Sequence, residues 1–183
     1  MRLETERLCL RPWRQDDADE LYELAKDPRV GPAAGWPVHT GVENSRQIIR
    51  EVLSAEGTFA VELKKEGRVV GSIGLMRMEQ SNLSIGANEA EIGYWVGVPY
   101  WGQGIIPEAV RELLRYGFEE LALDCIWCGY FEGNEKSHRV QEKCGFCFQR
   151  TEKEKPWPLT GEIHTEHITC ITKEEWRKNI KKN

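Results

Sequence analysis

The sequence lacks an apolar run long enough to cross a membrane, an excess of positive charge, and any internal repeat or low-complexity tract. A membrane-spanning helix needs about 20 mostly apolar residues, and no stretch of this chain approaches that pattern. Residues 1–7, which read MRLETER, are largely charged and contain no apolar segment of the kind that a secretory signal requires. We therefore expect a cytoplasmic protein with no membrane partner.

The charge balance is mildly acidic. Lys and Arg total 25 against 30 Asp and Glu, which gives a formal net charge of −5. A protein that follows a nucleic-acid backbone normally carries a basic surface, so we expect no nucleic-acid partner. An acidic protein is compatible with a cationic acceptor such as an amine.

The length and the residue pattern fit one mixed α/β domain over residues 1–183. The chain is 40% hydrophobic and long enough to bury a substantial core. Apolar spacing of 3.6 or 2 residues separates expected helices from expected strands. Strands are expected at 7–11, 59–63, 68–75, 88–98, 124–129, 148–151 and 164–171. Helices are expected after Asp16 or Asp17, over 42–53, from Pro107 to 121 and over 135–144, with a loop at 31–37 and a charged tail at the end.

The segment 92–109 reads as a strand, a glycine-containing turn and the start of a helix. Such a turn directs several backbone N–H groups toward one spot, where the positive end of the helix also lies, and this arrangement binds anions such as a pyrophosphate. Taken alone, the spacing of Gly102 and Gly104 fits equally well a tight turn that needs glycine only for a positive φ.

The segment 134–146 reads as a second helix, one strand further along the chain. Asn134 is a residue typical of a helix N-cap. Ser137 shares a helical stripe with Val140 and Cys144, so its hydroxyl is expected to face inward. A buried hydroxyl needs a hydrogen-bond partner, which a ligand or a backbone carbonyl could supply.

Together these two segments resemble the GNAT acetyltransferases, in particular the branch that acetylates ribosomal-protein N-termini and its many relatives. That family carries a pyrophosphate loop of the form [RQ]-x-x-G-x-[GA], and a later N-x-x-S helix that ends in E-K-x-G-F, here residues 142–146. The resemblance begins at residues 3–11 and reaches the late strands. It implies a GNAT-like, mostly antiparallel central sheet with helices on both faces.

The resemblance implies an enzyme that transfers an acetyl group from acetyl-CoA to a primary amine, by direct attack in a ternary complex. The amine could belong to a protein N-terminus, an aminoglycoside or a polyamine. No metal is expected, and a homodimer is possible. The expected cofactor-binding residues contact the pantetheine arm or the pyrophosphate: Val96, Val98, Trp101, Gly102, Gln103, Gly104, Ile105, Ile106, Asn134 and Ser137. The backbone N–H of Val96 is the donor implied for the oxyanion, and Ser137 is implied as the acid that protonates the leaving thiolate.

The loop departs from the family pattern at three positions. Trp101 stands where the motif has Arg or Gln, although this branch often has an aromatic residue there. Ile106 replaces the final small residue and is expected to crowd the loop. Pro107 removes an N–H group, but as the first helical residue it need not remove one that binds phosphate.

An attacking amine must first lose its proton. At neutral pH this costs roughly 4 kcal/mol for a lysine-like amine and about 1 kcal/mol for an α-amine with a pKa near 8. Glu91, on the strand before the glycine turn, is the candidate general base, although an ordinary solvated carboxylate is at least as good an interpretation. Other interpretations add His39, His164 and His167 as bases, and Trp36 and Trp157 as pocket-lining residues; all five also fit simple packing.

Two rival functions stay open. Cys125, Cys128, Cys144 and Cys147 form two C-x-x-C pairs at a spacing that fits a zinc-binding module. Against this, Cys125 and Cys128 fall in an expected strand, where residues three apart point to opposite faces. The second rival is a GNAT-like domain that binds acyl-CoA as a sensor without turnover.

Overall fold

A computed structural model describes residues 1–181 and contains eight strands in one sheet, in the order β1-β2-β3-β4-β5-β6-β8-β7. The pairs β1–β2, β2–β3, β3–β4, β6–β8 and β7–β8 are antiparallel, and β5–β6 is parallel. The expected mixed α/β, mostly antiparallel fold is confirmed. The chain divides into two units, residues 1–74 with 94–109, and residues 75–93 with those from 110 onward.

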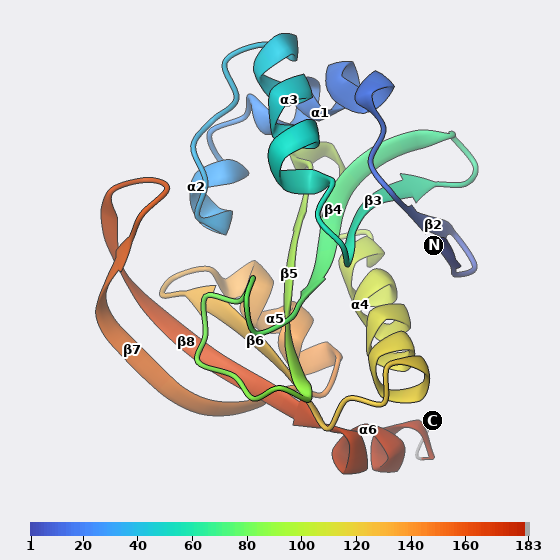
Figure 1. Ribbon diagram of the computed structural model, residues 1–183, viewed down its shortest axis with the longest axis vertical. Helices are drawn as coiled ribbons and strands as arrows, with labels where there is room; N and C mark the ends of the chain where they lie inside the picture. The colour runs from blue at the N-terminus through green and yellow to red at the C-terminus, as the bar shows by residue number, and fades with distance from the viewer. Residues whose placement is uncertain (182–183) are drawn as a thin grey trace. The chain divides into compact units, whose positions relative to one another are not determined.

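The first unit holds the N-terminal strands, the first helices and the glycine turn (Figure 1). Its elements are β1 (Leu3–Glu4), β2 (Leu8–Arg11), η1 (Gln15–Asp17), α1 (Ala18–Ala25), α2 (Gly31–Ala34), α3 (Val42–Ile48), η2 (Ile49–Leu53), β3 (Thr58–Leu63), most of β4 (Arg68–Met76), the end of β5 (Glu89–Val96), η3 (Val98–Tyr100) and the start of α4 (Ile105–Arg115). The strands β3 and β4 and the helix α1 lie where the sequence predicts them.

Two expectations for this unit need correction. Residues 31–37 are not all loop, because Gly31–Ala34 form the one-turn helix α2 with a proline in its first turn. Gly35 then takes a φ of +87° and ends the turn. The helix expected from Pro107 begins two residues earlier, at Ile105. Pro107 is tolerated there because N–H groups in a first turn have no acceptor within the helix.

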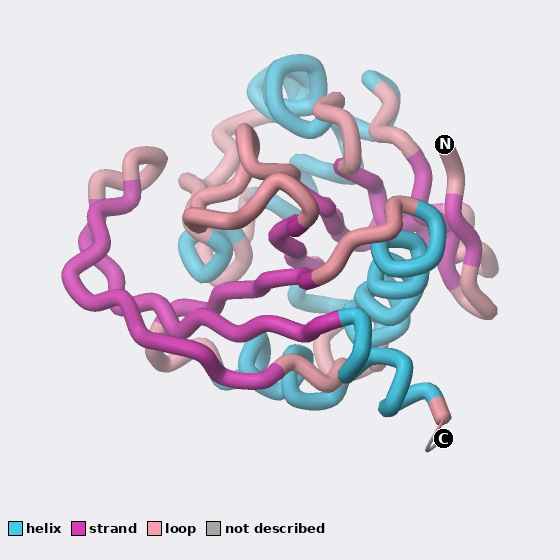
Figure 2. Tube along the Cα trace, turned by 60° about the horizontal axis from the view of Figure 1, so that its bottom comes forward, coloured by secondary structure: helices cyan, strands magenta, loops and turns pink. Residues whose placement is uncertain are grey.

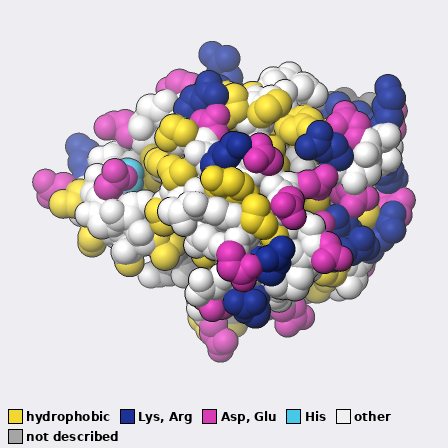
Figure 3. Space-filling view, turned by 90° about the horizontal axis from the view of Figure 1, so that it is seen from above, with side chains coloured by type: hydrophobic (Ala, Val, Ile, Leu, Met, Phe, Trp, Pro, Cys, Tyr) yellow, Lys and Arg dark blue, Asp and Glu magenta, His cyan; other side chains and the backbone are white. Residues whose placement is uncertain are grey.

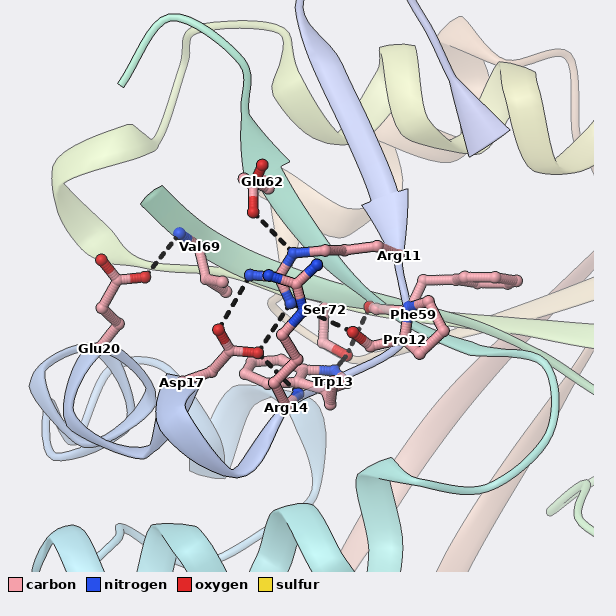
Figure 4. Close-up of polar contacts among 10 residues, drawn as sticks. All are labelled: Arg11, Pro12, Trp13, Arg14, Asp17, Glu20, Phe59, Glu62, Val69 and Ser72. Carbon is pink, nitrogen blue, oxygen red and sulfur yellow. Dashed lines mark hydrogen bonds and ion pairs between the residues drawn. The ribbon is translucent and has the colours of Figure 1, made fainter. Parts of the chain in front are cut away.

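A buried ion-pair network ties the strands of the first unit to η1, the turn that leads into α1 (Figure 4). The Arg11 guanidinium donates two hydrogen bonds to Asp17, at 2.8 and 2.9 Å, and one of 2.6 Å to Glu62. Asp17 also accepts the backbone N–H of Arg14 at 2.8 Å. These hydrogen bonds raise the pKa of Arg11, the bond to Asp17 most of all. The buried charge of Arg11 is therefore paired with two carboxylates, which offsets the cost of removing it from water.

The second unit holds the C-terminal strands and helices. Its elements are the remainder of β5 and α4, η4 (Tyr116–Glu120), β6 (Cys125–Phe131), α5 (Glu135–Lys143), β7 (Cys147–Trp157), β8 (Glu162–Thr172) and α6 (Lys173–Ile180). Gly145 follows α5 with a φ of +86°, the C-terminal signal that the sequence predicts.

Several late elements differ from the prediction. Strands β7 and β8 are longer than expected and form an extended hairpin, seen as the long magenta curve in Figure 2, with Pro156 inside β7. The expected charged tail is the helix α6, because Thr172 and Glu175 form a capping box at its start. The helix expected from Pro107 to 121 ends at Glu120 in η4, and Leu121 is 36% exposed.

One face of the molecule carries charges of both signs. On the face seen in Figure 3, Lys and Arg side chains are interspersed with Asp and Glu side chains. Among the helices that the structure describes, none is long and apolar enough to span a bilayer.

Candidate active site

The glycine turn of the first unit leads directly into α4. Gly102 and Gly104 adopt φ values of +74° and +73°, a region that favours glycine. An added Cβ on Gly102 would meet nothing within 4 Å, so backbone conformation and not crowding selects glycine there. The N–H groups of Ile105 and Ile106 open the helix, where donors have no acceptor within the helix. The turn therefore combines donors and helix dipole in the way that suits an anion.

Two hydrogen bonds fix the shape of this turn. The indole N–H of Trp101 donates to the carbonyl of Val96 at 3.0 Å. The side-chain amide of Gln103 donates to the carbonyl of Pro99 at 2.9 Å. Ile106, expected to crowd the turn, is only 4% exposed, and its side chain packs inward instead. Trp101 and Gln103 thus support the turn through hydrogen bonds, and the side chain of Ile106 is buried.

Sequence reasoning missed Arg7, whose side chain also holds the turn. Its guanidinium donates to the carbonyl of Gln103 at 3.0 Å and to the carboxylate of Glu108 at 2.6 Å. The backbone N–H of Arg7 and the hydroxyl of Thr5 bond the same carboxylate, at 2.9 and 2.5 Å. Because the partners are about a hundred residues apart in sequence, no local pattern signals them.

The strand that precedes the turn ends earlier than expected. β5 stops at Val96, and Val98 begins the 3₁₀ turn η3, where its carbonyl accepts the N–H of Trp101 at 3.2 Å. The strand expected over 88–98 therefore ends two residues early, and Val98 lies outside the extended segment.

In the second unit, Asn134 takes the capping role: its side-chain oxygen accepts the N–H of Ser137 at 3.2 Å. Ser137 is half-buried, and its hydroxyl accepts the side-chain amide of Gln141 at 3.3 Å. Gln141 also donates to the carbonyl of Gly129 at 3.1 Å and accepts the hydroxyl of Thr169 at 2.8 Å. Gln141 was not predicted as a site residue. It is 1% exposed, and its hydrogen bond to the Ser137 hydroxyl orients that side chain.

Glu91 is buried, so the interpretation of a solvated carboxylate is wrong. It is 5% exposed and accepts the Ser81 hydroxyl at 2.6 Å and the N–H of Asn82 at 2.9 Å. Burial raises the pKa of Glu91, and the nearby carboxylate of Glu166 adds to this, while the two hydrogen bonds and Lys155 oppose it. A buried carboxylate with a raised pKa and fixed donors can serve as a general base.

The other candidate bases have local partners. In the first unit, His39 bonds Ser45 at 2.8 Å, lies 5.2 Å from the ring of Trp36, and has its pKa lowered by burial. In the second unit, His167 bonds Thr151 at 2.9 Å. His164 stacks on Phe131 at 4.0 Å and faces Trp157 edge-on at 6.4 Å. Trp36 and Trp157 lie in different units, and each packs against aromatic neighbours.

Comparison with known proteins decides the family. Residues 7–147 match the model of the acetyltransferase (GNAT) domain, which is well over half of the chain. The chain belongs to the GNAT acetyltransferase family.

Individual relatives agree with this. The chain is 35% identical over 181 residues to "Putative ribosomal N-acetyltransferase YdaF" of Bacillus subtilis, covering 93% of this chain and 94% of that protein. It is 37% identical over 129 residues to "Uncharacterized N-acetyltransferase p20" of Bacillus licheniformis, covering 68% and 70%. Among solved structures, a GNAT-family acetyltransferase from Bacillus anthracis superposes with a TM-score of 0.81 at 28% identity, covering 95% of this chain and 99% of that one. This GNAT acetyltransferase is thus an acetyl-CoA-dependent N-acetyltransferase that acts on an amine, as its sequence motifs predict.

The paired cysteines of this acetyltransferase do not gather as their spacing suggests. Cys125 and Cys128 lie in β6 and point to opposite faces, as the strand prediction requires. Cys144 caps α5 and is buried, whereas Cys147 starts β7 and is exposed. Within residues 1–181, no three His, Cys, Asp or Glu side chains are grouped so that they could hold a metal ion.

Proposed function

We propose that this acetyltransferase transfers the acetyl group to the α-amino group of a protein or peptide N-terminus. One observation supports the binding of acetyl-CoA, namely the turn at residues 102–106. Gly102 and Gly104 both adopt a left-handed conformation there, and the turn and the start of α4 together suit a pyrophosphate. The relative named as a ribosomal N-acetyltransferase supports the acceptor half.

In this proposal the chain holds acetyl-CoA, which supplies the acetyl thioester, at two places. The N–H groups of residues 102–106 bind the pyrophosphate, and Trp101 and Arg7 keep the turn in shape. The backbone of Val96 and the side chain of Asn134 hold the pantetheine arm. The N–H of Val96 stabilises the oxyanion, because a fixed donor favours the charge that develops on the thioester carbonyl.

Glu91 takes the proton of the attacking amine, and Ser137 donates a proton to the leaving thiolate. Only the ionised form of Glu91 accepts a proton, so its raised pKa places the onset of activity above the usual pH range of a carboxylate. An α-amine suits this base better than a lysine side chain, because deprotonation costs about 1 kcal/mol instead of roughly 4 kcal/mol at neutral pH.

Steady-state acetylation assays test the proposal. Peptides with free N-termini, the same peptides blocked at the N-terminus but carrying lysine, and small amines such as spermidine and kanamycin should be compared. The proposal predicts the highest kcat/KM with free N-termini and none with blocked peptides. A higher kcat/KM with spermidine or kanamycin would show that the acceptor is a small amine and not a peptide N-terminus. Binding of acetyl-CoA without turnover on any amine would instead indicate a non-catalytic sensor.

A further inference from the structure

Three of the six cysteines lie on one face of neighbouring strands in the second unit. They are Cys125 in β6, Cys170 in β8 and Cys147 in β7. The register places Cys147 directly opposite Cys170, and Cys125 opposite Thr172. Because residues two apart on a strand share a face, Cys170 lies on the same face as Cys125. The grouping therefore takes one cysteine from each C-x-x-C pair and adds a third that the spacing does not mark.

The register of Cys147 and Cys170 is compatible with a disulfide. Directly opposed residues of antiparallel strands have Cα atoms about 4.5 to 5.5 Å apart, and a disulfide bridges Cα atoms about 4.4 to 6.8 Å apart. Both side chains leave the sheet on the same side. Both thiols are free in the structure, so the two strands hold them in position for a bond that is not yet formed.

The two thiols differ in access and in reactivity. Cys147 is exposed, whereas Cys170 is 7% exposed. A hydrogen bond from the Cys125 thiol lowers the pKa of Cys170, while burial and the nearby Glu175 raise the pKa of Cys147. The thiolate is the nucleophile in thiol–disulfide exchange. Cys147 is therefore the thiol that an oxidant in solution can reach, and its raised pKa makes this first attack slow. Cys170, which lies opposite Cys147, then attacks the adduct.

We propose that Cys147 and Cys170 form a redox-active dithiol that a low-molecular-weight disulfide converts into a cross-strand disulfide. The Cys147 thiolate attacks the small disulfide, forms a mixed disulfide and releases one small thiolate. The Cys170 thiolate then attacks the Cys147 sulfur, and the second small thiolate leaves. The two protein thiols lose two protons and two electrons in total, and the small disulfide is reduced to two thiols.

The test uses the full folded chain with oxidised glutathione as the probe. After incubation, free thiols are alkylated and the linkages are mapped by mass spectrometry of proteolytic peptides. The wild type should yield a Cys147–Cys170 disulfide that dithiothreitol reverses. Cys170→Ser should instead retain glutathione on Cys147, and Cys125→Ala should slow release of the second thiol several-fold. Cys128→Ala, on the opposite face of β6, is the matched control and should behave as the wild type.

Mapping of the wild type alone can overturn the proposal, so the result does not depend on how any variant folds. Stable glutathione on Cys147 with Cys170 still open to alkylation would contradict it. A Cys125–Cys170 linkage in place of Cys147–Cys170, or six thiols that stay free throughout, would contradict it as well. None of these results bears on acetyl transfer, which is measured separately.

Discussion

The guanidinium of Arg7 donates a hydrogen bond of 3.0 Å to the backbone carbonyl of Gln103, the residue between the two left-handed glycines. The N-terminal hairpin thereby holds the turn that opens α4. Since the same guanidinium pairs with Glu108 in the first turn of α4, one side chain fixes both the turn and the helix start.

Removal of Arg7 should weaken acetyl-CoA binding without unfolding the protein. The ion pair is partly exposed, with 45% of the Arg7 side chain accessible, and such pairs contribute up to about 1 kcal/mol. Arg7→Ala should therefore raise the KM for acetyl-CoA by about 5-fold and leave kcat nearly unchanged. Arg2→Ala, which removes an exposed pair with Glu4, is the control in steady-state kinetics. An unchanged KM for Arg7→Ala would show that the contact does not shape the turn.

Glu91→Gln should reduce kcat by about 10²- to 10⁴-fold, the usual contribution of a general base. Because burial raises the pKa of Glu91, wild-type activity should rise with pH through a value above 4.5, and the variant should lose that limb. Glu89→Gln is the matched control: Glu89 is two residues away on β5 and bonds the indole of Trp127 at 2.9 Å. Equal pH profiles for wild type and Glu91→Gln would remove Glu91 from the mechanism.

The same raised pKa affects stability. The folded state binds the Glu91 proton more tightly than the unfolded state does, so this group's contribution is fully present below pH 4.5 and is lost as the pH rises through the raised pKa. Glu91→Gln should therefore show a shallower decline of unfolding free energy with pH above 4.5. Urea titrations across that range measure the slopes of wild type and variant, and parallel slopes would contradict the raised pKa.

Ser137→Ala separates a chemical role from a structural one. The hydroxyl accepts one hydrogen bond from Gln141, whose amide keeps a second acceptor in the carbonyl of Gly129. Stability should therefore change by less than about 1 kcal/mol, while kcat should fall by about 10²- to 10⁴-fold if the hydroxyl protonates the leaving thiolate. Lys136→Ala, an exposed change on the same turn, serves as the control. A large loss of stability with normal kcat would make Ser137 a structural residue.

Arg11→Met should destabilise the protein by about 3 to 5 kcal/mol, because it leaves the buried Asp17 and the largely buried Glu62 without their cation. Arg29→Met, which breaks an exposed pair with Asp27, should lower stability by less than about 1 kcal/mol. Urea unfolding at neutral pH gives both values. Similar midpoints for the two variants would show that burial of the Arg11 network does not matter.

Sequence patterns predicted the parts of this fold that local rules control. Apolar spacing predicted the strands β3 and β4, and the E-K-x-G-F signature predicted the end of α5 near Gly145. The helix α6 was missed because the charged residues 173–181 mask the capping box of Thr172 and Glu175. The site residues, the single domain and the homodimer remain predictions.

Long-range contacts escaped sequence reasoning altogether. The partners of Arg7 and of Gln141 lie about a hundred and about thirty residues away, and no periodicity connects them. The burial of Glu91 was also missed. Its hydrogen-bond partners, Ser81 and Asn82, lie in an irregular segment that has no strand or helix pattern. The cysteines show the same limit: strand register, and not C-x-x-C spacing, decides which of them meet.

Calorimetric titration with acetyl-CoA tests the central claim, that residues 102–106 bind the pyrophosphate. Gly104→Asp places a negative charge and a strained residue in the turn, where φ is +73°. Gly67→Asp imposes a similar strain, at a φ of +62°, in the β3–β4 turn of the same unit. The account predicts one-to-one binding by the wild type and by Gly67→Asp, and loss of binding by Gly104→Asp. Equal affinity in all three proteins would contradict it.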